Sequence, residues 1–502
     1  MRQRVLNSFL LCVALGGCAV GPNYHTPDMK MPDNFAAKPT ADAAKDKPVI
    51  DAAEWWKALG DNELNSLIDR VIKANPQLDI ALTRLQEARQ QEDVVLGGAL
   101  PEINASAAAG RGTGSDLTKG GADSVLRAGD NGTGYKHITQ IYGFDSAWEL
   151  DLFGKYRREM EAAGYETKAA AAARNEVLIT IIADVVRAYV DMRGLQMQQA
   201  VLNQNIDTVK QYADVVHKRY DRGITNELDV SLADRQLATL QAQQAPLSAQ
   251  IQAAQFTIAS LLGEFPENMI AELEKPGTIP VLPEKLDTGV PVDLLRKRPD
   301  IQQAERELAA STARVGVAEA NLFPHVTLLG GAGYQGQGLG VSPAQNGFIW
   351  SVGPSVGAPI LDFGTLDALV NVADLQTHEQ LVRYKQTVID AVQDVDTASS
   401  AYAAQQDRLK NLNTALVASK KAVDLASQRY DRGLTDMLNV IDAQRQQFDL
   451  QQQYVVAQQT AAEKFIALYK ALGSGWENYQ TIPPTRTPLP AIIAALKRTV
   501  EH

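Results

Sequence analysis

The sequence predicts a mainly α-helical protein with a smaller β portion, built from two copies of one repeat. First, the segment Arg219–Thr225 recurs 210 positions later as Arg429–Thr435. Second, helix breakers are scarce: only two glycines and no proline lie between Gly154 and Gly223, and neither residue type occurs between Gly364 and Gly433. Third, four segments alternate apolar and polar residues. A duplicated pattern of helix, two strands, long helix, turn and helix accounts for all three observations.

The N-terminus has the features of a secretory leader. Arg2 and Arg4 precede an apolar run, Phe9–Leu15, that is too short to span a membrane as a helix. Residues 1–17 are therefore predicted to be a signal peptide. The segment Leu15–Cys18 resembles the lipobox of bacterial lipoproteins, in which the cysteine is acylated after cleavage. We expect Cys18 to carry lipid and, with alanine rather than aspartate after it, to direct the chain to the outer membrane.

Composition excludes several classes of function. The 502 residues include 48 Lys and Arg against 59 Asp and Glu, a net charge of −11, which opposes nucleic-acid binding. The two cysteines, Cys12 and Cys18, lie near the N-terminus, and the 6 histidines are scattered singly. We therefore expect no disulfide within the mature chain, no metal site and no cofactor.

Each long helix is expected to fill the segment between its two glycines and to reach about 100 Å. Apolar residues recur at spacings of three and four along them, as in Leu178, Ile182, Val185, Tyr189 and in Val388, Val392, Val395, Tyr402. Such narrow seams favour coiled-coil neighbours on each side, although an ordinary helix bundle would also use them.

The alternating segments are the four predicted strands. They are Ile103–Ala107, Tyr142–Leu152, Val326–Tyr334 and Phe348–Ile360. Their lengths and aromatic ends are typical of strands that cross a membrane. In the second segment the face opposite the apolar one carries Asp145 and Glu149.

Four strands are too few to enclose a pore, and an open sheet edge is not tolerated in lipid. Three copies of the chain would supply twelve strands and a barrel about 24 Å in diameter, which leaves an open aqueous bore. The sequence therefore predicts a homotrimer, with Asp145 and Glu149 lining the lumen of a twelve-strand barrel.

The chain resembles the TolC-type outer-membrane efflux proteins, specifically the NodT-like lipoprotein branch that works with resistance-nodulation-division pumps. The matching stretches are Cys18–Tyr24, Trp55-Trp56, Leu294–Ile301 with Ala304-Glu305, Phe323-Pro324 and both Arg-Tyr-Asp-Arg-Gly turns. The resemblance implies a trimer with a twelve-strand barrel in outer-membrane lipid, an α-helical periplasmic tunnel, a gated inner end and no catalysis. Its implied partners are a periplasmic adaptor (membrane fusion) protein and an inner-membrane pump.

This resemblance also suggests domain boundaries. We expect the leader at 1–17, an N-terminal extended and equatorial segment at 18–74, the first repeat at 75–262, an equatorial linker at 263–297, the second repeat at 298–472 and a C-terminal tail of the equatorial region at 473–502.

The two turns are predicted to be the periplasmic tips, where Gly223 and Gly433 can adopt the positive φ that ends a helix. In the family such tips contact the adaptor. The docking residues implied here are Arg222, Gly223, Thr225, Arg432, Gly433 and Thr435. The alternative is that these residues only form turns.

The resemblance also places a periplasmic gate next to the tips. Family members latch the closed end through a tyrosine and an acid that align with Tyr430 and Asp229. Asn439 and Asp442 lie three positions apart and would form rings in a trimer, with Asp442 as the charged one. A basic latch residue of some relatives aligns with Thr435, so that ion pair is not expected here. Asp229 and Asp442 could instead simply face solvent.

Two other motifs are set aside. The glycines of residues 331–336 fit a dinucleotide-binding pattern, but no helix is expected after them. Asp145, Glu149 and Asp151 lack a shaped pocket for hydrolysis.

We expect a passive outer-membrane duct that exports drugs, other toxic small molecules or metal ions. The alternatives are the duct of a type I protein secretion system and a lipid-anchored periplasmic coiled-coil scaffold.

Overall fold

A computed structural model describes residues 19–29, 51–113, 136–282, 296–338 and 346–479. The predicted leader, Cys18 and most of the predicted C-terminal tail 473–502 lie outside these residues. The chain divides into two compact units. We call them the sheet unit (the described parts of 1–27, 87–169 and 304–384) and the core unit (those of 28–86, 170–303 and 385–502).

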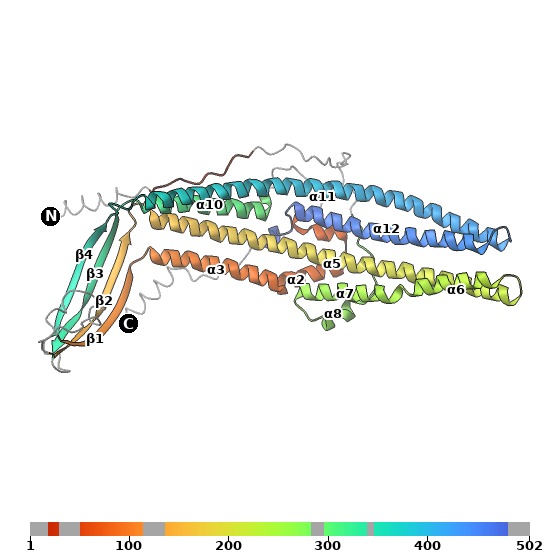
Figure 1. Ribbon diagram of the computed structural model, residues 1–502, viewed down its shortest axis with the longest axis horizontal. Coiled ribbons are helices and arrows are strands. Elements are labelled where there is room, and N and C mark those ends of the chain that lie inside the picture. The colour runs from red at the N-terminus through yellow and green to blue at the C-terminus, as the bar shows by residue number, and fades with distance from the viewer. Residues whose placement is uncertain (1–18, 30–50, 114–135, 283–295, 339–345, 480–502) are drawn as a thin grey trace. The chain divides into compact units, whose positions relative to one another are not determined.

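The sheet unit contains one antiparallel sheet with strand order β1-β2-β3-β4 (Figure 1). The strands are β1 (Glu102–Thr113), β2 (Lys136–Leu150), β3 (His325–Gly338) and β4 (Asn346–Gly357). All four predicted strands are confirmed. Two of them end earlier than predicted, at Leu150 and Gly357 rather than at residues 152 and 360.

The early strand ends have a local cause. The carboxylate of Asp151 accepts the backbone N–H groups of Tyr156 at 3.2 Å and Arg157 at 3.1 Å, which starts a helix instead of extending β2. After β4, Pro359 has no N–H group to donate to a sheet ladder. Asp362 then accepts the backbone N–H of Leu366 at 2.9 Å, at the start of the second long helix.

The long helices confirm the repeat. Helix α5 (Lys155–Asp221) and helix α11 (Thr365–Asp431) each have 67 residues. Both halves also place a proline at the first position of the helix before the strands, in α3 (Pro76–Gly98) and α10 (Pro299–Ala320). Proline suits this position because the first N–H groups of a helix have no partner within it.

The halves differ after the turns. The first half has two helices, α6 (Glu227–Gln241) and α7 (Gln244–Leu262), whereas the second has one helix, α12 (Met437–Ala471). Pro246 lies in the first turn of α7 and cannot donate the helical hydrogen bond to the carbonyl of Ala242, while Val456 at the matching position can donate its own. The expectation of one unbroken helix in the first half is therefore wrong.

The core unit also contains the short helices η1 (Ala52–Leu59), α2 (Asn62–Ala74), α8 (Pro266–Leu273) and η2 (Glu477–Tyr479). Its centre is aromatic: Trp55 stacks on Tyr469 with ring centroids 5.4 Å apart and contacts Phe465 at 5.9 Å. The four predicted seam residues of α5 are buried here. Burial extends beyond a narrow seam, to Ile179, Ala183 and Val190 on other faces, because this part of α5 lies within one large apolar cluster.

Among the described helices, none combines the length and the apolarity that crossing a membrane as a helix would require.

Candidate functional site

The register of the sheet gathers the apolar positions of all four strands on one face. Across the sheet, Ala105 pairs with Phe144, Phe144 with Ala332, and Ala332 with Trp350. Directly paired residues lie on the same face, and alternation along each strand extends this face over the whole sheet. Its other members are Ile103, Ala107, Tyr142, Ser146, Trp148, Leu150, Val326, Leu328, Gly330, Tyr334, Phe348, Val352, Pro354 and Val356. We call this the apolar face.

An aromatic row crosses the apolar face. Tyr142 stacks on Tyr334 with ring centroids 5.7 Å apart, and Tyr334 meets Phe348 edge to face at 5.4 Å. Trp350 is 70% exposed in the single chain. A soluble sheet would cover such side chains with a second layer, whereas strands in a lipid bilayer present them outward with aromatic residues near the interface.

The opposite face is polar and small. Asp145 pairs across the sheet with Asn104 and Gly331, and Gly331 pairs with Ser351. Among the described residues, Asp145 forms no hydrogen bond or ion pair and is exposed. We call this the polar face.

Glu149 shares the polar face with Asp145 but has partners. Its carboxylate lies 3.5 Å from the Lys155 ammonium and accepts a 3.1 Å hydrogen bond from the Tyr156 hydroxyl. Burial, followed by the negative charge of Glu149, raises the pKa of Tyr156 to about 12, so this hydroxyl remains a donor. Glu149 thus joins the end of β2 to the start of α5.

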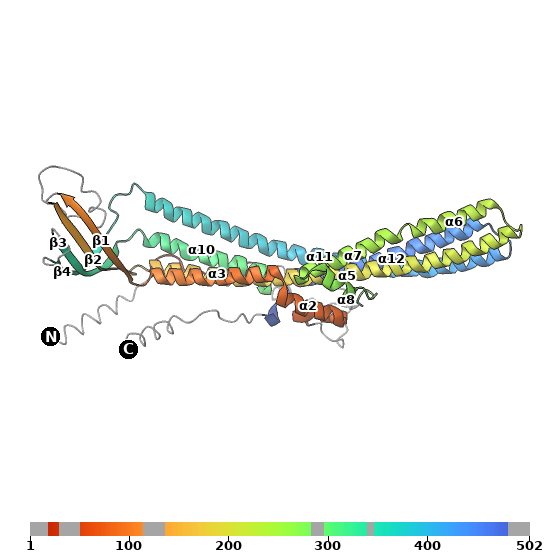
Figure 2. The same ribbon diagram turned by 90° about the horizontal axis from the view of Figure 1, so that it is seen from below.

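The two predicted tip turns have the same backbone geometry. In the first, Gly223 has φ +71°, its N–H donates to the carbonyl of Tyr220 at 2.8 Å, and the N–H of Ile224 donates to Arg219 at 2.9 Å. In the second, Gly433 also has φ +71°, with the matching hydrogen bonds to Tyr430 and Arg429 both at 2.9 Å. This is the helix-ending pattern that favours glycine. Each turn joins two helices into a hairpin, α5 with α6 and α11 with α12, and the two hairpins lie side by side (Figure 2).

Substituting a turn glycine is expected to loosen a tip. Gly433→Ala places a Cβ at positive φ, which costs about 1–2 kcal/mol. We expect faster amide hydrogen exchange at Leu434, measured by mass spectrometry. Gly164→Ala is the matched control: this glycine lies inside α5 with open space around it, so alanine should not loosen the helix. Equal exchange at Leu434 in Gly433→Ala and the native protein would contradict the proposed strain.

Asp229 and Asn439 occupy duplicated positions after the turns. The Thr225 hydroxyl donates to the Asp229 carboxylate, whereas the Asn439 amide donates to the Thr435 hydroxyl at 2.8 Å. The replacement of acid by amide thus reverses the direction of the same hydrogen bond. Each pair holds its turn against the next helix.

Tyr430 and Asp229, the two expected latch residues, do not bond to each other within the described chain. Tyr430 is only 8% exposed and packs with Val216, Met437 and Val440. The guanidinium of Arg219 lies 4.8 Å from the centre of its ring. In this chain the tyrosine therefore holds the two hairpins together.

Asp442 is half-exposed, and its side chain has hydrogen-bond partners. Its carboxylate accepts hydrogen bonds from Arg445 at 3.1 Å and from Gln446 at 2.7 Å. The Arg445 charge lies on the same helix face and offsets that of Asp442, so the pair contributes less negative potential than an isolated carboxylate.

Sequence reasoning missed the exposed apolar side chains of the tips. Ile224 and Leu434 follow the turn glycines, and Leu228 and Leu438 lie one helical turn further on. Each is at least 58% exposed. Their recurrence at both duplicated positions was the available signal. Together with Arg222, Thr225, Arg432 and Thr435 they form what we call the tip surface.

A histidine–carboxylate hydrogen bond found only in the first hairpin links α5 to α6. The His217 Nε2 atom lies 2.9 Å from the Asp234 carboxylate, and the hydrogen bond to Asp234 is the main cause that raises the pKa of His217. The matching residues of the second half are Ser427 and Gln444.

Acidification is expected to strengthen this contact. Because folding raises the pKa of His217, the stabilisation is complete below its ordinary pKa and disappears as the pH rises through the raised value. NMR titration should show a higher His217 pKa in the native protein than in Asp234→Asn. A pKa unaffected by Asp234→Asn would refute the assignment, and His217→Gln identifies the resonance.

Comparison with known proteins gives a consistent result. A model of the family described as outer membrane efflux protein matches residues 67–264 and 290–474. Nodulation protein T of Rhizobium leguminosarum bv. trifolii is 29% identical over 463 residues, 92% of this chain and 95% of that protein. The toluene efflux pump outer membrane protein TtgC of Pseudomonas putida is 27% identical over 482 residues, 95% of this chain and 96% of that protein.

Solved structures similar to this chain are also outer-membrane channels. The outer-membrane channel OprN is 35% identical, with a TM-score of 0.80 over 92% of this chain and 100% of that one. The open state of the MtrE outer membrane channel of Neisseria gonorrhoeae is 26% identical, with a TM-score of 0.75 over 93% of this chain and 100% of that one.

Proposed function

Because this chain belongs to the outer membrane efflux protein family, a family of channels and not of enzymes, we propose that it is the outer-membrane duct of a tripartite efflux system. The observation that carries this proposal is the two-faced sheet. Its apolar face suits lipid, its polar face suits water, and side chains of both faces are exposed in the single chain. Drugs and other toxic small molecules are the cargo that we propose, since named relatives belong to toluene efflux pumps.

A homotrimer closes this sheet. Strands β1 and β4 are its two edges, and each pairs on one side only. Edges in a bilayer need partners, and symmetric copies of the chain supply them: three chains give twelve strands. Helix α11 adds a second signal, because Leu375, Val382 and Ile389 are exposed at intervals of seven residues. This spacing is that of a coiled-coil seam and suits packing against a helix of another copy.

The tip surface is the proposed docking site for a periplasmic adaptor. Four exposed apolar side chains surrounded by arginine and threonine provide an apolar centre with a polar rim. Two of these apolar side chains belong to each tip, so each chain has two tips and a trimer would have six, in a ring. The adaptor in turn would connect the duct to an inner-membrane resistance-nodulation-division pump.

The gate would lie at this same end. Asp229, Tyr430, Asn439 and Asp442 all lie within about ten residues of a turn glycine, so movement of the hairpins would move them together. Lipid attached to Cys18 would add an anchor at the outer membrane. Two residues that follow Cys18 support a lipid anchor next to the sheet. The buried guanidinium of Arg158, near the start of α5, donates to the carbonyls of Val20 at 3.0 Å and Gly21 at 3.0 Å.

Two measurements test this function. The purified, acylated protein is expected to run as a heat-modifiable trimer and to give single-channel conductance in planar bilayers. In cells, Thr225→Cys and Thr435→Cys are expected to crosslink to a periplasmic adaptor. A lipid-anchored monomer without conductance would refute the duct and support a scaffold. A conducting trimer that neither cysteine joins to any adaptor would refute only the docking assignment.

A further inference from the structure

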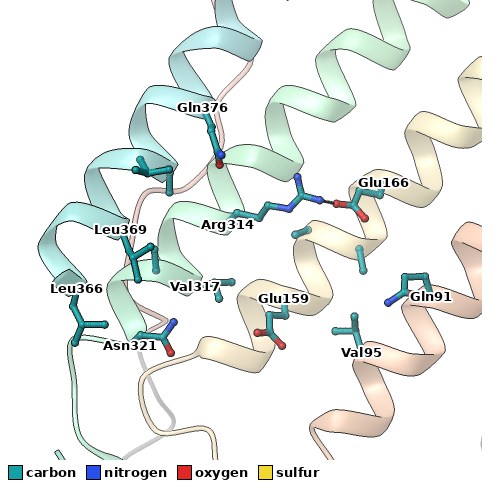
Figure 3. A pocket seen from close by; sticks show the side chains of 15 residues that line it. Gln91, Val95, Glu159, Glu166, Arg314, Val317, Asn321, Leu366, Leu369 and Gln376 are labelled. Atoms are coloured by element: carbon teal, nitrogen blue, oxygen red, sulfur yellow. Dashed lines mark hydrogen bonds and ion pairs between the residues drawn. The ribbon is translucent and has the colours of Figure 1, made fainter. Parts of the chain in front are cut away.

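A cavity of about 490 Å³ lies among four helices of the sheet unit (Figure 3). Helices α3, α5, α10 and α11 each contribute side chains to its lining. This volume falls in the range of sites for drug-sized molecules. No role proposed above uses it.

One part of the lining is apolar. Val95 comes from α3, Val317 from α10, and Leu366, Leu369 and Val372 from α11. The α11 residues recur at spacings of three, so they lie on one face of that helix. This part could cover the hydrocarbon body of a ligand.

The other part of the lining carries one unpaired negative charge. Glu166 and Arg314 form an ion pair and offset each other, as the dashed line in Figure 3 shows. Glu159 lines the cavity from α5, is partly buried, and forms no hydrogen bond or ion pair with any residue that the structure describes. The lining therefore has a net charge of −1 from Glu159.

We propose that this cavity binds a small organic cation, with the apolar body of the ligand against α11 and its cationic group beside Glu159. An anion would meet the unpaired carboxylate, and a neutral molecule would leave it without a partner. A hard metal cation needs six or more oxygen ligands in most sites, and this lining offers a single free carboxylate. The proposal concerns binding alone and does not require that the ligand be conducted.

The surroundings of Glu159 make this binding depend on pH. Burial is the first cause that raises the pKa of Glu159; Glu149 and Asp151 raise it further, and Lys155 lowers it. Within the cavity the paired Glu166 and Arg314 are the other charged groups. A raised pKa means that the carboxylate becomes protonated at a higher pH than an ordinary glutamate. The cation should therefore be released on acidification before ordinary carboxylates titrate.

The test uses the full-length, acylated protein in lipid nanodiscs, with ethidium as the probe. Ethidium carries a permanent positive charge, so only the protein titrates, and phenanthridine is its uncharged parent ring. Isothermal titration should show that ethidium binds the native protein more tightly than phenanthridine does. Glu159→Gln is expected to weaken ethidium about tenfold, the scale of one charge-assisted contact, and to abolish the pH dependence.

Two further variants make the result decisive. Glu379→Gln removes the same charge from an exposed pair with Arg383 on α11, outside the cavity, and should leave ethidium affinity unchanged. Leu369→Trp fills the cavity from an exposed position and should weaken both probes. Equal ethidium affinity in the native and Glu159→Gln proteins, or equal binding of the two probes, would overturn the proposal. Conductance, measured in parallel, separates this failure from failure of the proposed duct.

Discussion

Val352→Arg is expected to prevent assembly of the protein in the outer membrane. Val352 lies in the middle of β4 on the apolar face and is 67% exposed in the single chain. If that face meets lipid, each copy would place an arginine near the centre of the bilayer, at a cost of about 2–4 kcal/mol. Symmetry repeats this cost three times in a trimer. Heat-modifiable trimers in the outer-membrane fraction, detected by gel electrophoresis, should be lost.

Ser351→Arg is the matched control for this change. It introduces the same side chain one residue away, on the polar face that contains Asp145. Trimers should assemble, and the added positive charge should shift the ion selectivity of the channel toward anions. Assembly of Val352→Arg together with failure of Ser351→Arg would mean that the two faces have been assigned the wrong way round. If both variants assemble into trimers, the sheet does not meet lipid.

Leu438→Asp is expected to abolish adaptor docking while leaving the channel intact. Leu438 is 58% exposed, so a carboxylate there should not disturb folding. In a docked complex the same carboxylate would be desolvated and apolar burial would be lost, which together weaken docking by about 2–4 kcal/mol. That range corresponds to roughly 30- to 700-fold in affinity. Cells should lose efflux, and Thr435→Cys should no longer crosslink to the adaptor.

Two further variants show whether the loss of docking in Leu438→Asp comes from the lost apolar contact at the tip. Leu438→Met keeps an apolar side chain of similar volume and should retain efflux and crosslinking. Leu228→Asp changes the matching position of the first tip, and the double variant should be at least as defective as either single one. The docking assignment fails if Leu438→Asp forms conducting trimers that still crosslink through Thr435→Cys as the native tip does.

The helices and strands followed from local patterns. Apolar residues at spacings of three and four and the scarcity of helix breakers predicted two long helices, and both have 67 residues. Alternation predicted four strands and the residues on each face. The interruption at Pro246 was also visible in the sequence, since proline removes a helical hydrogen bond wherever it stands. Such features depend on neighbours along the chain, which the sequence displays directly.

The contact partners of individual side chains could not be predicted from these local patterns. The resemblance placed Tyr430 in a latch, which stays a prediction, and gave no sign that this tyrosine also packs between the two hairpins with Arg219 against its ring. Glu149 was placed on the same face as Asp145, but the neighbouring helix start supplies it with Lys155 and Tyr156. Identity and spacing gave no means of distinguishing the paired carboxylate from the free one.

The sequence alone therefore determined the repeat, the helix lengths, the two faces of each strand and the family. Only the tertiary structure decided which strands pair in which register, which tip residues stay exposed, and that four helices leave a cavity beside Glu159. The reason is physical: periodicity is set by backbone geometry within a segment, whereas burial and pairing depend on distances between segments that lie far apart in the sequence.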